Sequence, residues 1–507
     1  MAPSEGPGGR SVPAPDTFRH LEDPERADER TSRANGPRMD PRAETLQRLR
    51  DTFRSGRTRP RAFRASQLEG LSRFLRDHRD RLLGALADDL HKAPFEAELS
   101  ELSICQTEIN LALNNLRSWM QDQPVATNLA TRLDTAFIRK EPFGLVLIVA
   151  PWNYPLNLAV VPLVGAIAAG NCVVLKPSEL SRGVERVLAE VLPRYLDPSC
   201  FAVVLGGPQE TALLLENKFD YIFFTGTVHA PPRAPPAAAR HLTPVTLELG
   251  GKNPCYVDDA VDVQTVADRV AWARFFNAGQ TCVAPDYVLC SADTRDRLLP
   301  ALGAAVRRFY GDDPRRSPDL GRVVSPGHFR RLRALLDGGR VAIGGQTDEG
   351  ERYVAPTVLV DVTEDQPVMR EEIFGPILPI LTVGGLDEAI AFINRQDKPL
   401  ALYAFSNCSR VVRQVLDRTS SGGFCGNDGL MHMTLTSLPF GGVGNSGMGS
   451  YHGRFSFDTF SHHRGCLLRR AGLEKLNSLR YPPYAQCNLG LLLRTVEIQR
   501  RECCTLL

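Results

Sequence analysis

Residues 144–176 read GLVLIVAPWNYPLNLAVVPLVGAIAAGNCVVLK, in which two short β-rich runs flank a long apolar segment. The first run, Val146 to Val149, is followed by the proline-bounded segment Ala150–Pro155, which predicts a rigid turn directly after a strand. The second run, Cys172 to Leu175, has the length and composition of another buried strand. The stretch therefore predicts a strand, a turn, a helix and a second strand in succession.

The apolar run from 156 to 175, which includes the second strand, approaches the length of a membrane-spanning helix. Asn157, Pro162 and Asn171 interrupt it, and Gly170 followed by Asn171 is typical of a helix end. A buried helix that turns into a strand is therefore favoured over a membrane helix.

The same alternation continues along the chain, with β-rich runs at 201–204 and 221–224 and helical stretches between them. This pattern predicts a parallel α/β sheet. Residues 40–118 carry helical periodicity, and a second alternating block from 247 to 429 predicts a second α/β domain. Its strands are expected near Val257, Val288, Val341 and Ile377.

The composition narrows the class of protein. The 507 residues are 43% hydrophobic and carry a net charge of +2. This length predicts two or three domains, and the balanced charge argues against nucleic acid as a partner. The twelve cysteines are irregularly spaced and no secretory signal precedes them, so we expect free thiols in a reducing compartment.

The first 38 residues are rich in Arg, Pro and Gly and poor in apolar residues, so we expect a disordered extension. Acidic residues between Glu22 and Glu29 argue against a mitochondrial transit peptide. Because helical periodicity begins after Met39, we interpret Met39 as the working translation start.

Three segments carry candidate catalytic side chains. Cys282 closes the loop FNAGQTC, in which backbone N–H groups can face a bound substrate, although a cysteine taken alone is more often buried and inert. Glu248 lies between apolar residues and before two glycines, so burial should raise its pKa toward neutrality, as a general base requires. A salt-bridged surface glutamate is the alternative. Asn153 carries an amide that can donate to an oxyanion, or it can serve only to form the turn.

Together these segments resemble the aldehyde dehydrogenase superfamily from about residue 40 to 465. Three further motifs occur in the family's order: Lys176-Pro177-Ser178-Glu179 after a strand, then 372–376 (EIFGP), then 438–442 (LPFGG). The compact start and the stretch 446–453, SGMGSYHG, resemble the class 3 branch, particularly its B members. That branch acts on medium- and long-chain aldehydes.

The resemblance implies a role for each matching position. Cys282 is the nucleophile, Glu248 is the base, and Asn153 with the backbone N–H of Cys282 forms the oxyanion hole. An aldehyde would become a carboxylic acid through a thioester on Cys282, with NAD or NADP accepting a hydride and no metal involved. The residues implied to bind the cofactor are Lys176, Glu179, Thr225, Gly226, Glu372 and Phe374.

The resemblance also implies an α/β fold with a Rossmann-type cofactor domain, an α/β catalytic domain and a small β arm that bridges subunits of a homodimer. The expected boundaries are 39–118 and 142–247 for the cofactor domain, 248–428 for the catalytic domain, 119–141 and 429–460 for the arm, and 461–507 for a C-terminal tail.

Residues 442–447, GVGNSG, formally match the dinucleotide-binding glycine pattern. No strand, turn, helix and strand with a distant acid can follow them, so we interpret them as a loop near the active site.

The chain departs from the family pattern after Phe224-Thr225-Gly226 and rejoins it at Arg240. Family members continue with a small polar residue and a glycine that opens a helix toward the cofactor pyrophosphate. Residues 227–239 instead contain four prolines, which at this spacing should not sustain a helix. We interpret the segment as a local shift of reading frame, with a genuine divergent loop as the alternative.

A genuine segment would leave two alternatives to an active dehydrogenase. One is a membrane scaffold that has lost cofactor affinity, which NAD(P)+ binding would test. The other is a thiol esterase that uses Cys282 and Glu248 without hydride transfer, which ester turnover without cofactor would favour.

The chain ends in CCTLL, in which Cys504 begins a Cys-aliphatic-aliphatic-X box whose final Leu favours a geranylgeranyl group. Cys503 could carry a palmitoyl group, and Arg494, Arg500 and Arg501 could meet anionic headgroups. An unmodified tail is the alternative. We expect a lipid-anchored protein at the cytoplasmic face of the plasma membrane or of lipid droplets, with a fraction in the cytosol.

Overall fold

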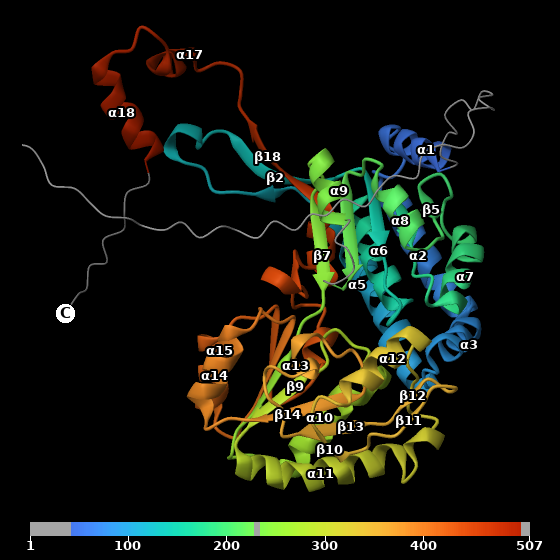
Figure 1. The fold of residues 1–507 in the computed structure, drawn as a ribbon. Coiled ribbons are helices and arrows are strands. Elements are labelled where there is room, and N and C mark those ends of the chain that lie inside the picture. Colours follow the sequence, from blue (N-terminus) through green and yellow to red (C-terminus); the bar gives the residue numbers. More distant parts are fainter. Residues whose placement is uncertain (1–41, 228–233, 498–507) are drawn as a thin grey trace, which may run out of the picture. The chain divides into compact units, whose positions relative to one another are not determined.

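The structure is a computed structural model that describes residues 42–227 and 234–497 (Figure 1). The expected disordered extension 1–38, the start at Met39 and the lipidation residues Cys503 and Cys504 lie outside the described residues. The helices and strands lie in the compact unit Glu44–Leu507, except that the first helix, α1, begins one residue earlier, at Ala43.

The first alternating block folds into a six-stranded sheet in the order β17-β7-β6-β3-β4-β5. All neighbours are parallel except β17, which is antiparallel to β7. Chain order reverses at β3, which pairs with both β4 and β6, so a ligand crevice is expected at the carboxyl end of β3. The strands are β3 (Leu145–Val149), β4 (Cys172–Lys176), β5 (Phe201–Val203), β6 (Tyr221–Gly226), β7 (Val245–Leu249) and β17 (Gly447–Met448).

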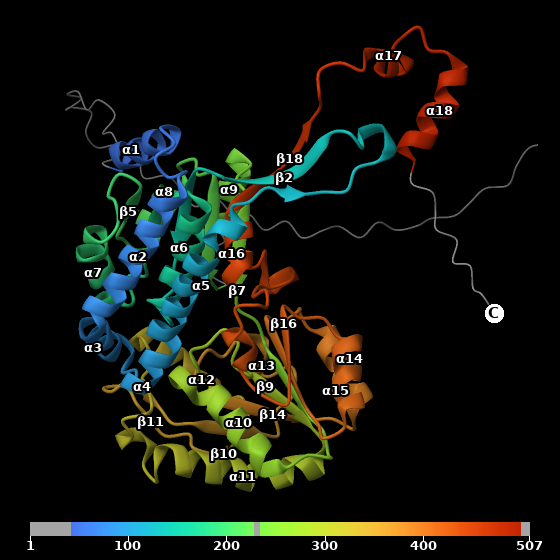
Figure 2. The same cartoon turned by 180° about the vertical axis from the view of Figure 1, so that it is seen from behind.

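Helices cover both faces of this sheet, and alternate residues of β3 face two separate cores. Val146 and Ile148 pack in the core that includes α2, α5 and α6, whereas Leu145 and Leu147 pack with α1 and α8. Because both faces are covered, the central strand β3 is apolar throughout. Figure 2 shows α2, α5 and α6 beside one another. The helices are α1 (Ala43–Arg54), α2 (Arg61–Asp77), α3 (Arg79–Leu90), α5 (Ser103–Trp119), α6 (Asn157–Ala169), α7 (Arg182–Glu190) and α8 (Pro208–Leu215).

The apolar run that approaches membrane length contains α6, which is buried along its whole length. The helix ends before Gly170, whose φ of 97° only glycine adopts without strain, and β4 begins two residues later. The expected helix, turn and strand are therefore confirmed. In the described part of the chain no helix is long and apolar enough to cross a membrane.

The second block folds into a seven-stranded sheet in the order β10-β13-β14-β9-β8-β15-β16, parallel except for β10. All four strands expected from the sequence are present. Helices α10 and α11 pack in one core and α12 and α14 in another. The elements are β8 (Pro254–Val257), β9 (Tyr287–Cys290), β10 (Arg340–Ile343), β13 (Thr357–Val360), β14 (Ile377–Thr382), β15 (Ala401–Phe405), β16 (Gly423–Gly426), α10 (Val263–Phe275), α11 (Ala292–Tyr310), α12 (Pro326–Leu335), α14 (Leu386–Arg395) and α15 (Ser409–Arg418).

The arm is a three-stranded antiparallel sheet of β1 (Gln123–Pro124), β2 (Thr135–Pro142) and β18 (Ser461–Leu468). The sequence boundaries differ from this, because they placed 429–460 in the arm and 461–468 in the tail. Residues 447–448 instead pair with β7, and α16 (Gly453–Thr459) packs on α6. The strand β18 is mostly exposed and has no alternating apolar pattern, so only its pairing with β2 defines it.

The proline-rich segment contains a helix, α9 (Ala234–His241), so the expectation that its prolines prevent a helix is wrong for these residues. Pro235 and Pro236 lie in the first turn, where a backbone N–H has no intrahelical partner to lose. Residues 228–233 lie outside the described residues.

The remaining α-helices and β-strands are short or lie after the arm. They are α4 (Pro94–Ala97), β11 (Thr347–Asp348), β12 (Tyr353–Val354), α13 (Pro367–Arg370), α17 (Glu474–Asn477) and α18 (Gln486–Val496).

Candidate active site

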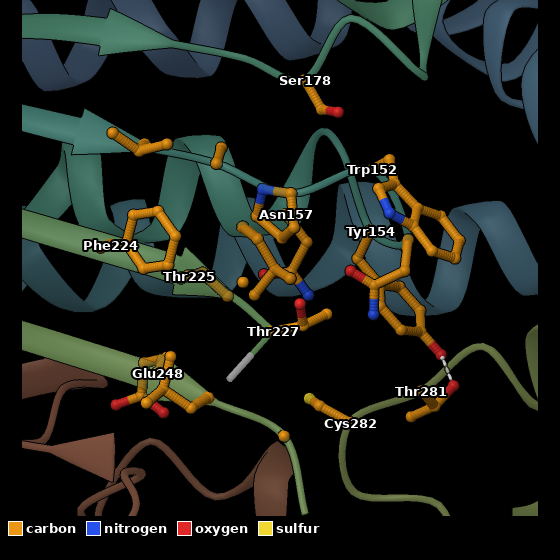
Figure 3. Close-up of a pocket in the computed structure, with 18 of the residues that line it drawn as sticks. Trp152, Tyr154, Asn157, Ser178, Phe224, Thr225, Thr227, Glu248, Thr281 and Cys282 are labelled. Atoms are coloured by element: carbon orange, nitrogen blue, oxygen red, sulfur yellow. Dashed lines mark hydrogen bonds between the residues drawn. The ribbon is translucent and has the colours of Figure 1, made fainter. Parts of the chain in front are cut away.

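The turn after β3 places Asn153 inside the protein at the point where the strand order reverses. Asn153 is 3% exposed, and its Nδ2 donates to the carbonyl of Gln280 at 3.1 Å. An amide nitrogen carries two hydrogens, so one remains for another acceptor. The neighbouring hydroxyl of Tyr154 bonds to Oγ1 of Thr281 at 2.6 Å, as Figure 3 shows. The turn is thus joined directly to the segment that ends in Cys282.

Cys282 follows a tightly turned backbone segment. After α10, Asn277 and Ala278 both have left-handed φ angles, 54° and 53°, and Gly279 follows with 73°. A Cβ on Gly279 would lie 2.2 Å from the carbonyl oxygen of Gly375, so only glycine fits there. This turn ends the helix abruptly and directs the next residues toward the crevice.

Gln280 holds the turn in place. Its carbonyl accepts from Asn153 and from Nδ2 of Asn277, both at 3.1 Å. Its side chain donates to the carbonyls of Asn277 and Arg322 and accepts from the N–H of Val324. Because every polar group of Gln280 is bonded, this residue fixes the segment before Cys282.

The environment of Cys282 disfavours the thiolate. Burial raises the pKa of the Cys282 thiol to about 12, and the nearby carboxylates of Glu372 and Glu248 add to the effect. At neutral pH the sulfur is therefore protonated in this state, and it needs a proton acceptor before it can attack.

Glu248 lies on β7 with 3% of its surface exposed, and neither carboxylate oxygen has a hydrogen-bond partner. Burial raises its pKa well above the ordinary value, as the flanking apolar residues predicted. The alternative of a salt-bridged surface glutamate is wrong. Gly447 of β17 pairs directly with Glu248, so the glycine pattern 442–447 is a loop beside this residue, as expected.

Glu372 and Phe374 lie at the same site. The carboxylate of Glu372 packs on Gly250, where a Cβ would lie 1.9 Å from its Oε2. Burial raises the pKa of Glu372 to about 8. The ring of Phe374 meets that of Trp152 edge to face at 5.3 Å.

A cavity of about 320 Å³ connects these residues with the carboxyl ends of β4 and β6 (Figure 3). Lys176 lies on its border, where its ammonium donates to the carbonyl of Gly206 at 2.8 Å and to Glu179 at 3.4 Å. The buried oxygens Oγ1 of Thr225 and Oε1 of Glu372 have no partner. All predicted site residues in the described chain, namely Cys282, Glu248, Asn153, Lys176, Glu179, Thr225, Gly226, Glu372 and Phe374, line this one cavity.

The cavity fits a dinucleotide because it combines a crevice at the switch point of a parallel sheet with a cation and unpartnered acceptors for hydroxyl groups. Within the described residues no group of three His, Cys, Asp or Glu side chains could hold a metal ion.

Sequence reasoning missed three side chains that shape the site. Tyr154 and Gln280 stood inside quoted motifs without a role, and the loop chemistry alone did not indicate their bonds. His452 borders the cavity and stacks on Phe440 at 5.1 Å, and burial lowers its pKa to about 4, so its ring is neutral. His452 also stood inside a quoted motif, the stretch 446–453, but its sequence context gave it no role, because its burial follows from the packing of Phe440 and Tyr451 around it.

Comparison with known proteins decides the family. The sequence model of the aldehyde dehydrogenase family matches residues 39–464. The chain belongs to the aldehyde dehydrogenase family. It is therefore an NAD(P)+-dependent enzyme that oxidises aldehydes, as its motifs predicted.

Among its relatives, "Aldehyde dehydrogenase family 3 member B1" of Rattus norvegicus is 70% identical over 92% of this chain and 100% of its own length. This confirms the resemblance to class 3 aldehyde dehydrogenases of the B type. A solved structure described as the substrate-bound state of Staphylococcus aureus AldH is 42% identical, covers 90% of this chain and 99% of its own, and has a TM-score of 0.87. An NAD-dependent aldehyde dehydrogenase from Sinorhizobium meliloti is 28% identical over 85% of this chain and 87% of its own, with a TM-score of 0.77.

Proposed function

We propose that this aldehyde dehydrogenase oxidises medium- and long-chain aldehydes at Cys282, with Glu248 as base and Asn153 in the oxyanion hole. One observation carries the proposal: a partly buried thiol and a buried carboxylate without any partner border the same cavity. Apolar side chains of that cavity, among them Leu158, Met433 and Phe440, suit an alkyl chain.

The first half-reaction uses the geometry around Cys282. Ionised Glu248, acting through a water, takes the thiol proton and passes it on to solvent. The thiolate then attacks the aldehyde carbon, a C–S bond forms, and the carbonyl electron pair moves to oxygen. The free Nδ2 hydrogen of Asn153 and the backbone N–H of Cys282 stabilise that oxyanion. NAD(P)+, when bound, would accept the hydride that this carbon loses as the oxyanion re-forms a C=O bond, which leaves the thioester on Cys282. Lys176, Glu179, Thr225 and Glu372 are the residues that would hold the cofactor.

The second half-reaction releases the acid. Water adds to the thioester carbon, its proton passes to Glu248, and the Cys282 thiolate leaves as the carboxylic acid forms. No hydrogen bond joins Glu248 to the thiol, so it acts through an intervening water or after rotating its side chain. Its raised pKa suits it to hold the proton that water gives up.

Two substitutions test these roles. Cys282→Ala should abolish aldehyde oxidation while Cys408→Ala, which alters an exposed cysteine, leaves it unchanged. Glu248→Gln should let acyl-enzyme accumulate, measured by mass spectrometry after rapid quenching. Residual turnover by Cys282→Ala would overturn the assignment, and ester hydrolysis without aldehyde oxidation in the unaltered protein would favour the thiol esterase.

The chain-length preference has its own test. For saturated aldehydes from acetaldehyde to hexadecanal, kcat/KM should rise with length, because each buried methylene contributes about 0.8 kcal/mol, or about fourfold. A flat series would contradict an extended apolar binding site.

We also propose that Cys504 carries a prenyl group and Cys503 a palmitoyl group, which anchor the protein at the cytoplasmic face of the plasma membrane or lipid droplets. Helix α18 supports this, since Leu489, Leu493 and Val496 are exposed at helical spacing shortly before the box. Cys504→Ser should move the protein to the cytosol and keep its activity on short aldehydes, whereas the control Cys487→Ser should stay on membranes. Retention of Cys504→Ser after a high-salt wash would refute the lipid anchor.

We propose that the arm forms a homodimer. Its strand β18 is at the edge of the sheet and carries the exposed Leu467, and Leu133, shortly before β2, is also exposed. Substitution of both leucines by Asp should give a monomer by light scattering, whereas Leu435→Asp, elsewhere on the surface, should not. An unchanged mass would place the interface elsewhere.

A further inference from the structure

A completely buried ion pair lies behind the turn that carries Asn153. The ammonium of Lys92 donates to Oε1 of Glu101 at 2.6 Å, and both side chains are 0% exposed. Desolvating two charges is costly, and such a pair can often be replaced by apolar residues without loss of stability. Stability alone therefore gives a weak reason for this pair.

The remaining bonds of the pair go to the turn. Lys92 donates to the carbonyl of Asn153 at 3.2 Å. Oε2 of Glu101 accepts from the backbone N–H groups of Leu156 at 3.1 Å and Asn157 at 2.8 Å. Asn157 opens the 13-residue helix α6, so the carboxylate also satisfies N–H groups that the helix start leaves free. Both ends of the turn are thereby held.

The same ammonium is also linked, through Tyr154, to residues 277–282, the nucleophile segment that ends in Cys282. It faces the ring of Tyr154 at 4.2 Å, and that residue's hydroxyl bonds to Thr281, next to Cys282. Nδ2 of Asn277 donates to the same Asn153 carbonyl at 2.9 Å. Lys92 thus lies where the turn and the nucleophile segment meet, although neither Lys92 nor Glu101 lines the cavity.

We propose that Lys92 and Glu101 are positioning residues that fix the amide of Asn153 where the oxyanion forms. The inference rests on the proposed role of Asn153. The pair holds the backbone on both sides of the side chain, so its loss lets the turn rotate and redirects Nδ2, without removing any group that touches the substrate.

The double variant Lys92→Met/Glu101→Gln tests this because it removes both charges of the pair together, and buried Glu96, which lies near Lys92, keeps the bond that it accepts from the N–H of Asn277. Its kcat for aldehyde oxidation should fall about a hundredfold with little change in KM, since a misplacement of about 1 Å can cost that much. Alkylation of Cys282 by iodoacetamide develops no oxyanion and should keep its rate. The control Lys140→Met/Asp458→Asn removes another lysine ion pair, between β2 and α16, and should stay within about twofold in kcat.

A double-mutant cycle with Asn153→Ala separates the outcomes. If the Lys92–Glu101 pair acts through Asn153, substituting the pair in the Asn153→Ala protein should cause no further loss of kcat. Full activity of Asn153→Ala would refute the proposed function of that residue. The positioning role would be overturned if Asn153→Ala lowers kcat and the pair variant does not. It would also be overturned if the two losses of kcat multiply in the combined variant.

A second variant keeps the test valid should the double variant not fold. Glu101→Asp retains both charges and withdraws the carboxylate by one methylene, so kcat should fall about tenfold while NAD(P)+ affinity stays unchanged. An unchanged kcat in soluble, folded Glu101→Asp would also overturn the proposal.

Discussion

Iodoacetamide should alkylate Cys282 slowly in the cofactor-free protein, and the rate should still be rising at pH 9. Burial raises the pKa of this thiol to about 12, whereas an ordinary cysteine has a pKa of about 9.0. The difference of about three pKa units corresponds to about 4 kcal/mol, or a thousandfold less thiolate below pH 9. Because Cys282 is partly exposed, this is an upper limit.

The assay follows the Cys282 peptide by mass spectrometry after timed alkylation between pH 6 and pH 10. The same cysteine in urea-unfolded protein gives the reference rate. In the folded protein the rate should rise steeply with pH from 7 to 10, because only the thiolate reacts, and the rise should be less than tenfold per unit near pH 8, where Glu372 becomes ionised.

The carboxylate of Glu372, next to Cys282, provides a second test of the raised thiol pKa. Glu372 raises the pKa of Cys282 when it is ionised, and its own pKa is about 8. Glu372→Gln should therefore speed alkylation at pH 9 and leave it unchanged at pH 6. A plateau in the unaltered protein below pH 9, or folded and unfolded rates that agree, would refute the reasoning and indicate a thiol already activated without cofactor.

Three further predictions concern stability and cofactor binding. Burial raises the pKa of Glu108 to about 7, so the native state binds more protons than the unfolded chain, and the free energy of unfolding falls as pH rises from about 4.5 to 7. Glu108→Gln should therefore raise the free energy of unfolding by up to about 3 kcal/mol at pH 8 and should not change it at pH 4. Equal gains at both pH values would contradict this. Gly279→Ala should cost more than about 3 kcal/mol in urea denaturation because its Cβ meets the carbonyl of Gly375, whereas Gly56→Ala, with a φ of 78° and its nearest contact at an ordinary 3.7 Å, should cost about 1–2 kcal/mol; equal costs would show that the contact relaxes. Lys176→Met should weaken NAD(P)+ binding about tenfold by calorimetry, since a hydrogen bond to a charged group contributes about 1.5–3 kcal/mol, and unchanged affinity would remove Lys176 from the cofactor site.

Local sequence patterns predicted much of the fold. The alternation of β-rich runs and helices predicted both parallel sheets, because a strand buried on both faces must be apolar throughout. The glycine after α6 separated a buried helix from a membrane span. Residue chemistry indicated the thiol, the acid and the amide of the cavity, because these are properties of short segments, and the resemblance to the family implied the cofactor-binding residues.

Tertiary structure decided what local pattern does not encode. The arm strand β18 exists only through its register with β2, more than 300 residues away, since its exposed residues carry no period. Pro235 and Pro236 are compatible with α9 because of where the helix begins, which their spacing did not indicate.

The site itself divides in the same way. The sequence by itself determined that Cys282, Glu248 and Asn153 are present in turns and strands suited to chemistry. Only the folded chain decided that Glu248 has no partner and that the Lys92–Glu101 pair lies behind Asn153. The physical reason is that desolvation and hydrogen bonding depend on which distant segments surround a group, and sheet pairing and packing across the whole chain set those neighbours.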